Sequence, residues 1–317
     1  MIALDEAIAA DNRPYTTTLR ILFFFVTTAS LLGQIFIILT YKSIRNKKNK
    51  FYGYVAMHSV LGLPWQFANY FNFLAQGDTD ACAFLGFLYA FSYSAYLLWS
   101  SVIAWVIYSS LKNKAQLYNL DFKYMVGVYV ASFLIMLYPL CTDGFGLYIG
   151  KDIAYCWFRK SGHNTLTFII ADMIPVILTT AFNIFCYVAS VLIVRKEYSR
   201  EESRQFYQFL LFPLLQFVAN SDFYARWISI WLTNTKSGLV SVEVIHIIFR
   251  TGEGFFEASA YMLNPQVRKD VQKGWCAKRN QYNKGLKSGS ELMINGSSIE
   301  NELNERTIRN QRLIDSF

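Results

Sequence analysis

Six long apolar runs, separated by short polar segments, constrain the fold of this chain more than any other feature. They cover residues 21–41, 51–76, 83–111, 124–141, 166–194 and 206–233. Each run reaches the roughly 17 residues that a helix needs to cross about 30 Å of hydrocarbon. A lone segment can satisfy its backbone hydrogen bonds in lipid only as a helix. The runs therefore predict six membrane-spanning helices.

The composition agrees with a membrane protein and argues against other classes. Charged residues make up only 16% of the 317 residues, against about 25% in soluble domains. The sequence has no Gly-rich phosphate loop, no paired-histidine metal motif and no nucleophile elbow, so we expect no enzyme, no cofactor and no metal site. The net charge of +8 comes from loops and a tail expected to be cytoplasmic, so we expect no nucleic-acid partner.

The basic residues of the short loops predict the orientation. The loop after the first run carries Lys42, Arg45, Lys47, Lys48 and Lys50, whereas the next loop, "GDTDAC", carries none. We therefore expect the first loop in the cytoplasm and residues 1–18 outside, in a multi-pass protein of the plasma membrane. The first run is too long for the core of a cleavable signal peptide, so we expect it to insert as a helix.

A seventh apolar segment, residues 240–263, carries five ionisable residues: Glu243, His246, Arg250, Glu253 and Glu257. Their spacing of three, four, three and four residues places them on one face of a helix. That face can point into a bundle while the other faces meet lipid. A seventh crossing also keeps the polar tail, residues 279–317, in the cytoplasm as a disordered segment. The prediction is an all-α membrane protein with a seven-transmembrane helix bundle over residues 19–263.

The ionisable residues in the outer halves of the last three crossings predict a ligand cavity. Asp172, Asp222 and Arg226 belong to the fifth and sixth runs, and we expect them to face Glu243, His246 and Arg250. The basic groups would suit an anionic small molecule, although acidic groups match them in number. Glu253 and Glu257 lie deeper, where an internal salt-bridge network that only holds helices together is an equal alternative to a functional role.

Two cysteines predict a disulfide bond. Cys82, at the outer end of the third run, and Cys156, in the loop before the fifth, are the two cysteines expected on the oxidising side of the membrane. A bond between them would tie that loop over the third helix, and two free thiols are the alternative.

The residues after the seventh segment predict a short eighth helix over residues 264–278. Asn264 can cap it, and Pro265 suits its first turn. Val267, Val271 and Trp275 would form a narrow apolar edge on the membrane surface. The neighbouring basic side chains would meet lipid headgroups.

Four features of the chain occur together: the seven predicted crossings with an outer N-terminus, Cys82, Cys156 followed by Trp157, and the stretch "GEGFFEASAYMLNPQVRKDVQKGW". In these features the chain resembles G-protein-coupled receptors of the secretin-like and cyclic-AMP-receptor-like clan. This stretch is similar to the clan's seventh-helix pattern at Gly254, Phe255, Tyr261, Leu263, Asn264, Val267, Arg268 and Trp275. The resemblance implies a receptor for an extracellular ligand with a heterotrimeric G-protein as its partner.

The resemblance also implies a switch network at the inner side of the bundle. His58 falls where secretin-like receptors often place a histidine, and we expect it to act with Glu253, Glu257 and Asn264. The stretch "VIYSSLKNK" lacks both the usual acidic partner and an Asp-Arg-Tyr triplet, so the partner of His58 stays open. The short outer terminus without cysteine favours a small ligand and the cyclic-AMP-receptor-like branch.

A proton- or ion-coupled transporter is the alternative function. It would line its interior with the same kinds of Glu, His and Arg side chains. Such a transporter is expected to contain an internal repeat, and the runs show no convincing one. The sequence argues strongly against a light-driven retinal protein, because such a protein needs a lysine in the last crossing and residues 240–263 have none.

Overall fold

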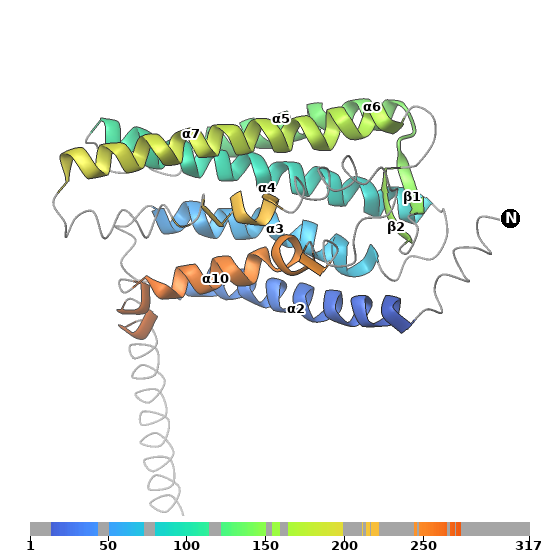
Figure 1. Cartoon of the computed structure of the whole chain (residues 1–317), viewed down its shortest axis with the longest axis horizontal. Coiled ribbons are helices and arrows are strands. Elements are labelled where there is room, and N and C mark those ends of the chain that lie inside the picture. The colour runs from blue at the N-terminus through green and yellow to red at the C-terminus, as the bar shows by residue number, and fades with distance from the viewer. Residues whose placement is uncertain are drawn as a thin grey trace, which may run out of the picture.

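The computed structural model describes most of the residues between Pro14 and Lys273 (Figure 1). It covers residues 14–43, 51–72, 80–113, 122–149, 154–158, 164–198, 244–245 and 247–264, with short pieces at 211, 214–215, 217–221, 267–269 and 271–273. The described residues are mostly helical, as the apolar runs predict. The predicted tail, residues 279–317, lies outside the described residues. So do four of the predicted ligand-binding residues: Asp222, Arg226, Glu243 and His246.

Helices occupy the first five predicted crossings. They are α2 (Pro14–Ser43), α3 (Phe51–Asn72), α4 (Asp80–Lys112), α5 (Phe122–Cys141) and α7 (Ile174–Glu197), the last preceded by α6 (Asn164–Phe168) and the π-helical η1 (Ile169–Met173). The seventh segment contains the π-helical η2 (Ile247–Thr251) and α10 (Glu253–Leu263). Of the predicted sixth crossing, the structure describes only short helical pieces at 211, 214–215 and 217–221.

Among the residues that the structure describes, four helical segments are long and apolar enough to cross a membrane: Thr18–Lys42, Asp80–Lys112, Phe122–Cys141 and Leu166–Glu197. They coincide with the first, third, fourth and fifth predicted crossings. Large apolar side chains on them point outward, among them Phe25 at 66%, Leu134 at 61% and Leu178 at 64% exposure. An outward apolar surface of this extent suits lipid contact.

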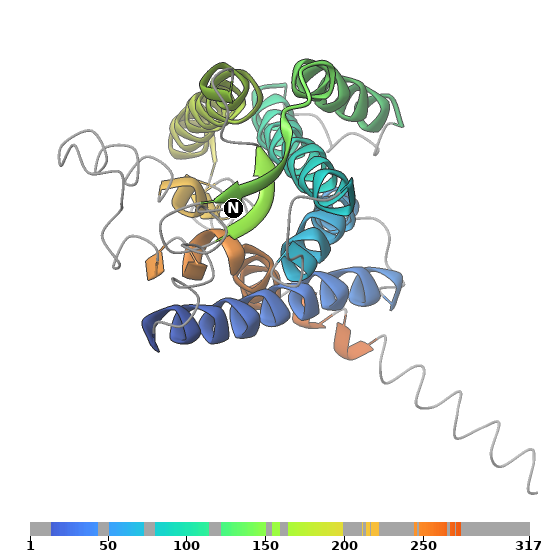
Figure 2. The same ribbon diagram turned by 90° about the vertical axis from the view of Figure 1, so that its right-hand side faces the viewer.

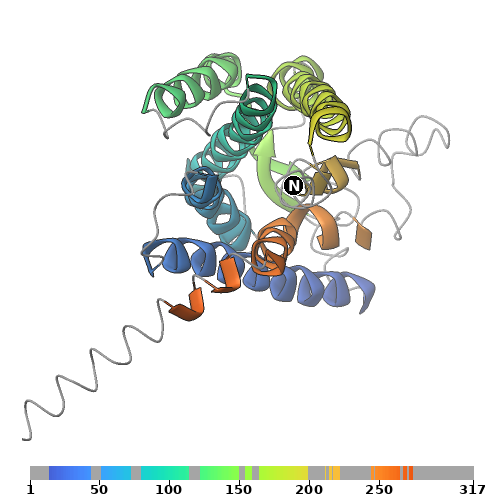
Figure 3. The ribbon, with the colours of Figure 1, turned by 90° about the vertical axis from the view of Figure 1, so that its left-hand side faces the viewer.

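Helix α4 lies at the centre of the arrangement. It packs against α3, α5, α7 and both β-strands. Figures 2 and 3 show α5 and α7 on its two sides. Small buried side chains such as Ser92, Ser94 and Ala95 allow this close approach. Helix α2 packs against α3 and α10 on the other side of the bundle.

A two-stranded β-hairpin, which the apolar runs did not predict, is added to the otherwise helical fold. Strands β1 (Phe145–Ile149) and β2 (Ala154–Phe158) pair antiparallel in the loop between α5 and α6. The apolar residues 145, 147 and 149 alternate, and Gly150 follows them, which is an ordinary hairpin pattern. The hairpin lies at the end of the bundle where α2 begins (Figure 1). We call this the hairpin end.

The predicted disulfide between Cys82 and Cys156 is confirmed. It joins β2 to the first turn of α4. Phe145 and Phe158 are buried in one apolar cluster with Ala90 of α4. The loop is therefore held on α4 both covalently and by packing.

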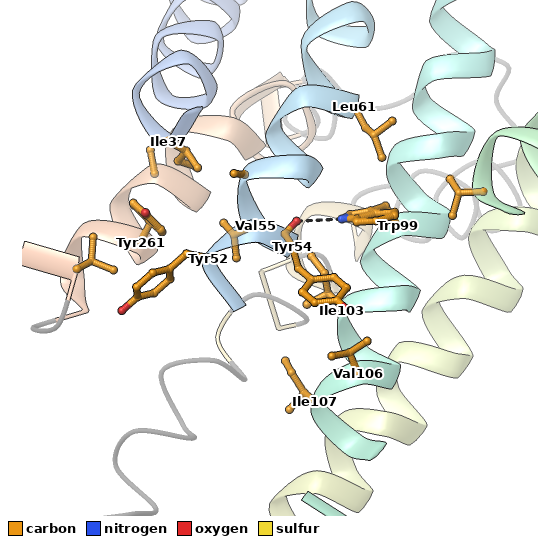
Figure 4. Packing of buried hydrophobic residues seen from close by; sticks show 14 of the residues in the cluster. Ile37, Tyr52, Tyr54, Val55, Leu61, Trp99, Ile103, Val106, Ile107 and Tyr261 are labelled. Atoms are coloured by element: carbon orange, nitrogen blue, oxygen red, sulfur yellow. Dashed lines mark hydrogen bonds between the residues drawn. The ribbon is translucent and has the colours of Figure 1, made fainter. Parts of the chain in front are cut away.

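Among the described residues, the largest buried cluster lies toward the opposite end and joins α2, α3, α4, α5, α7 and α10 (Figure 4). Within it, the indole nitrogen of Trp99 donates a hydrogen bond to the carbonyl of Tyr54 at 2.9 Å. Val267 and Val271 also belong to this cluster, with 1% and 7% exposure. The apolar edge expected on the membrane surface is thus buried in protein at these two positions. Trp275 lies outside the described residues.

Candidate functional site

The ionisable face of the seventh segment points inward where the structure describes it. Arg250, Glu253 and Glu257 are 5%, 2% and 3% exposed. Ile245 and Phe255, on other faces, are 42% and 49% exposed. The burial predicted from the spacing is confirmed for these three residues.

Arg250 meets Asp172 across the bundle. Its Nη2 atom lies 3.7 Å from Oδ1 of Asp172, and both side chains are almost fully buried. The guanidinium also lies over the ring of Tyr93, 4.3 Å from its centroid. A cation on an aromatic face gains electrostatic energy, and more so when water is excluded. The Tyr93 hydroxyl donates to Oδ1 of Asn220 at 2.8 Å, which brings the predicted sixth segment to this cluster. We call Asp172, Arg250, Tyr93 and Asn220 the upper cluster.

Both members of this ion pair lie in π-helical turns. Asp172 belongs to η1 and Arg250 to η2. A π-turn adds one residue to the helix and so redirects the side chains that follow, and such turns are frequent at functional sites. Pro175 stands in the first turn of α7, directly after η1. Its ring would clash with a carbonyl of a regular preceding turn, which gives η1 a local cause.

Glu257 forms a second cluster nearer the opposite end. Its Oε1 atom lies 2.8 Å from Nδ1 of His58 and accepts a hydrogen bond of 2.8 Å from the Tyr96 hydroxyl. The imidazole of His58 stacks on the Tyr96 ring, with 3.9 Å between the centroids. These residues, the lower cluster, come from α3, α4 and α10. The acidic partner of His58, left open by the sequence, is therefore Glu257 of the seventh segment.

Trp65 connects the two clusters. Its ring lies 5.3 Å from that of Tyr93 and 5.4 Å from that of Tyr96, between centroids. Trp65 is fully buried. Rings in such contact are packed too tightly for one to move alone. The two clusters therefore share one wall, formed by α3 and α4.

The helix break between η2 and α10 is stabilised by neighbouring helices. The carbonyl of Thr251 accepts a hydrogen bond from the Gln66 side chain at 3.1 Å. The amide of Gly254, at the start of α10, donates to Oγ of Ser30 at 3.0 Å. Backbone groups at helix ends need such partners when they are buried. A Cβ atom on Gly254 would meet the Ser30 carbonyl at 2.7 Å, so α2 and α10 approach closely there.

The structure brings together part of the predicted site. Asp172 joins Arg250, and His58 joins Glu257. Glu253 is buried one turn before Glu257. Asn264 ends α10, and its Oδ1 accepts from the Val267 amide at 3.4 Å, in line with its predicted capping role.

Tyr93 and Tyr96, the aromatic residues of the two clusters, were not singled out from the sequence, and neither was their neighbour Tyr89. Tyr89, Tyr93 and Tyr96 are spaced four and three residues apart, the same spacing that identified the ionisable face. That spacing could have placed them on one face of α4. It could not have named their partners.

The chemistry of the site is that of charge pairing and hydrogen bonding. Among the described residues, no group of three or more His, Cys, Asp and Glu side chains is placed to hold a metal ion. Neither the protein-family models nor the curated proteins compared with this chain gave a match.

Proposed function

We propose that this protein is a seven-helix G-protein-coupled receptor, which binds a small extracellular ligand at the upper cluster and signals to a heterotrimeric G-protein at the opposite end. One observation carries the proposal. A single helical segment holds both Arg250, paired with Asp172, and Glu257, paired with His58 and Tyr96. Their separation of seven positions in the sequence corresponds to about 10 Å along a helix.

This arrangement supports a mechanism of population shift. A ligand that offers an acidic group to Arg250 competes with Asp172 for the guanidinium. The resulting change in η2 is carried through Gly252 into α10, which holds Glu257. The ligand stabilises whichever helix arrangement it binds better, and its differential affinity is the only energy available for the change.

The membrane placement is part of the proposal. The N-terminus lies outside, since the basic residues concentrate in the loops at the opposite end. Epitope tags at residue 1 and residue 317 test this placement. Antibody should reach the first tag on intact cells and the second only after permeabilisation. If antibody reached the tag at residue 317 on intact cells, the proposed receptor with seven crossings would be ruled out.

The decisive experiment is nucleotide exchange on added G-proteins by the purified protein, across a panel of small anionic metabolites. Arg250→Leu should abolish the response while surface expression persists. Arg20→Leu, an exposed arginine at the hairpin end, is the matched control and should respond normally. Full ligand response by Arg250→Leu would overturn the proposed binding site.

A proton- or ion-coupled transporter is the second candidate. The buried contact of His58 with Glu257 and Tyr96 favours it, because paired titratable groups inside membranes also serve as proton relays. Solute flux into proteoliposomes, driven by a pH gradient and lost in Glu257→Gln, would support the transporter and displace the receptor.

A further inference from the structure

A cavity opens on the surface of the bundle at the end opposite the hairpin. Its volume is about 200 Å³, and it is lined by Trp105, Val106 and Ser109 of α4 and by Tyr124 of α5. Trp105 is 41% exposed, so the cavity opens outward rather than toward the clusters described above. It belongs to neither of them.

An aromatic row continues from this cavity to α7. The ring of Trp105 lies 6.3 Å from that of Phe182, and the ring of Tyr108 lies 6.0 Å from that of Phe185. Phe182 and Phe185 are 38% and 58% exposed. Since α5 and α7 flank α4 (Figures 2 and 3), the cavity and the row form one outward surface across three helices. We call it the aromatic surface.

Basic side chains border the aromatic surface at the helix ends. Lys112 follows Trp105 by seven residues, on the same face of α4, and its Nζ atom lies 5.8 Å from the Tyr108 ring. Lys196 follows Phe185 by eleven residues, three helical turns on the same face of α7. Both are exposed, as is Lys123 in the first turn of α5. Among the described residues at these helix ends, three exposed lysines stand against the one carboxylate of Glu197, so the described rim is positive overall.

We propose that the aromatic surface binds one anionic phospholipid of the leaflet at this end. An acyl chain lies along Trp105 and Phe185, and the headgroup lies between Lys112 and Lys196. Basic pockets between membrane helices on the cytoplasmic side are suited to anionic headgroups, and Trp and Tyr favour the membrane interface. This inference rests on the proposed membrane placement and not on receptor activity.

Native mass spectrometry of the purified full chain tests the site. The protein is reconstituted with dioleoyl-phosphatidylserine in an excess of dioleoyl-phosphatidylcholine and then transferred to detergent. We expect one retained phosphatidylserine. Lys112→Ala and Lys196→Ala should each weaken the affinity for phosphatidylserine roughly fivefold, because the loss of one basic residue near an anionic membrane surface weakens binding by about that factor. Lys42→Ala, at the end of α2 away from the aromatic surface, is the matched control and should retain the lipid.

A separate measurement tests the proposed contact between the acyl chain and Trp105. Brominated phosphatidylserine should quench the tryptophan fluorescence of the unaltered chain more than that of Trp105→Phe. Equal retention of both lipids, no retained lipid, or an equal loss in Lys42→Ala would overturn the proposal. None of these outcomes depends on G-protein signalling, so failure of the lipid site and failure of the receptor function remain distinguishable.

Discussion

His58 of α3 and Glu257 of α10 lie 2.8 Å apart, Nδ1 to Oε1, with almost no exposure of either side chain. The same carboxylate oxygen accepts the hydroxyl of Tyr96 from α4. One oxygen atom therefore joins three helices. Removal of the carboxylate would leave the His58 imidazole and the Tyr96 hydroxyl buried without this partner. Burial of a polar group without its partner lowers the stability of the folded protein.

The lower cluster predicts a coupling between His58 and Glu257. Glu257→Ala should destabilise the protein by about 3 kcal/mol, because it removes one partner of a buried pair. The double variant His58→Ala/Glu257→Ala should lose less stability than the sum of the losses in the two single variants. We expect the difference to be about 1 kcal/mol or more. Thermal unfolding in detergent measures both effects. Strict additivity, or an equal loss in the control Ser259→Ala on the same helix, would contradict the prediction.

The ion pair of the upper cluster predicts that exchanging the charges of Asp172 and Arg250 is partly tolerated. Asp172→Arg or Arg250→Asp alone places like charges together in a buried site, so each should lower the yield of folded protein sharply. The double variant restores opposite charges at 3.7 Å and should recover at least about 1 kcal/mol of stability. Size-exclusion profiles and unfolding midpoints are the readouts. A double variant no better than the worse single variant would argue against the pair.

The disulfide predicts a redox-sensitive stability. Cys82→Ser/Cys156→Ser should cost about 2 to 4 kcal/mol, because the bond closes a long loop in the unfolded chain. A reducing agent should lower the unfolding midpoint of the unaltered protein and leave that of the double variant unchanged. Cys141→Ser, which removes an exposed free thiol, is the control and should behave like the unaltered protein.

The contact between α2 and α10 predicts opposite effects of two Gly-to-Ala changes. A Cβ atom on Gly33 would lie 2.5 Å from the Gly254 carbonyl oxygen. Gly33→Ala should therefore separate the helices and cost about 1 to 3 kcal/mol. Gly127 of α5 has nothing within 4 Å of the same position. Gly127→Ala should leave the unfolding midpoint unchanged or raise it, as alanine favours helix. A tolerated Gly33→Ala would refute the close approach.

The local part of this fold was predictable from the sequence. Length and hydropathy identified the helices that the structure describes at the first five predicted crossings, because a helix that crosses lipid must satisfy its own backbone. The spacing of Arg250, Glu253 and Glu257 identified a buried face, because helical periodicity is a property of the chain alone. The cysteine positions identified the Cys82–Cys156 bond.

Only the tertiary structure decided which side chains meet. The partner of His58 is on α10, and the cation of Arg250 lies on Tyr93, an aromatic residue that the sequence did not single out. The two π-turns and the paired strands also appear only in the folded chain. Periodicity gives the direction of a side chain relative to its own helix. The rotation and crossing of one helix against another depend on the packing of every residue between them, and that packing determines the contacts at the site.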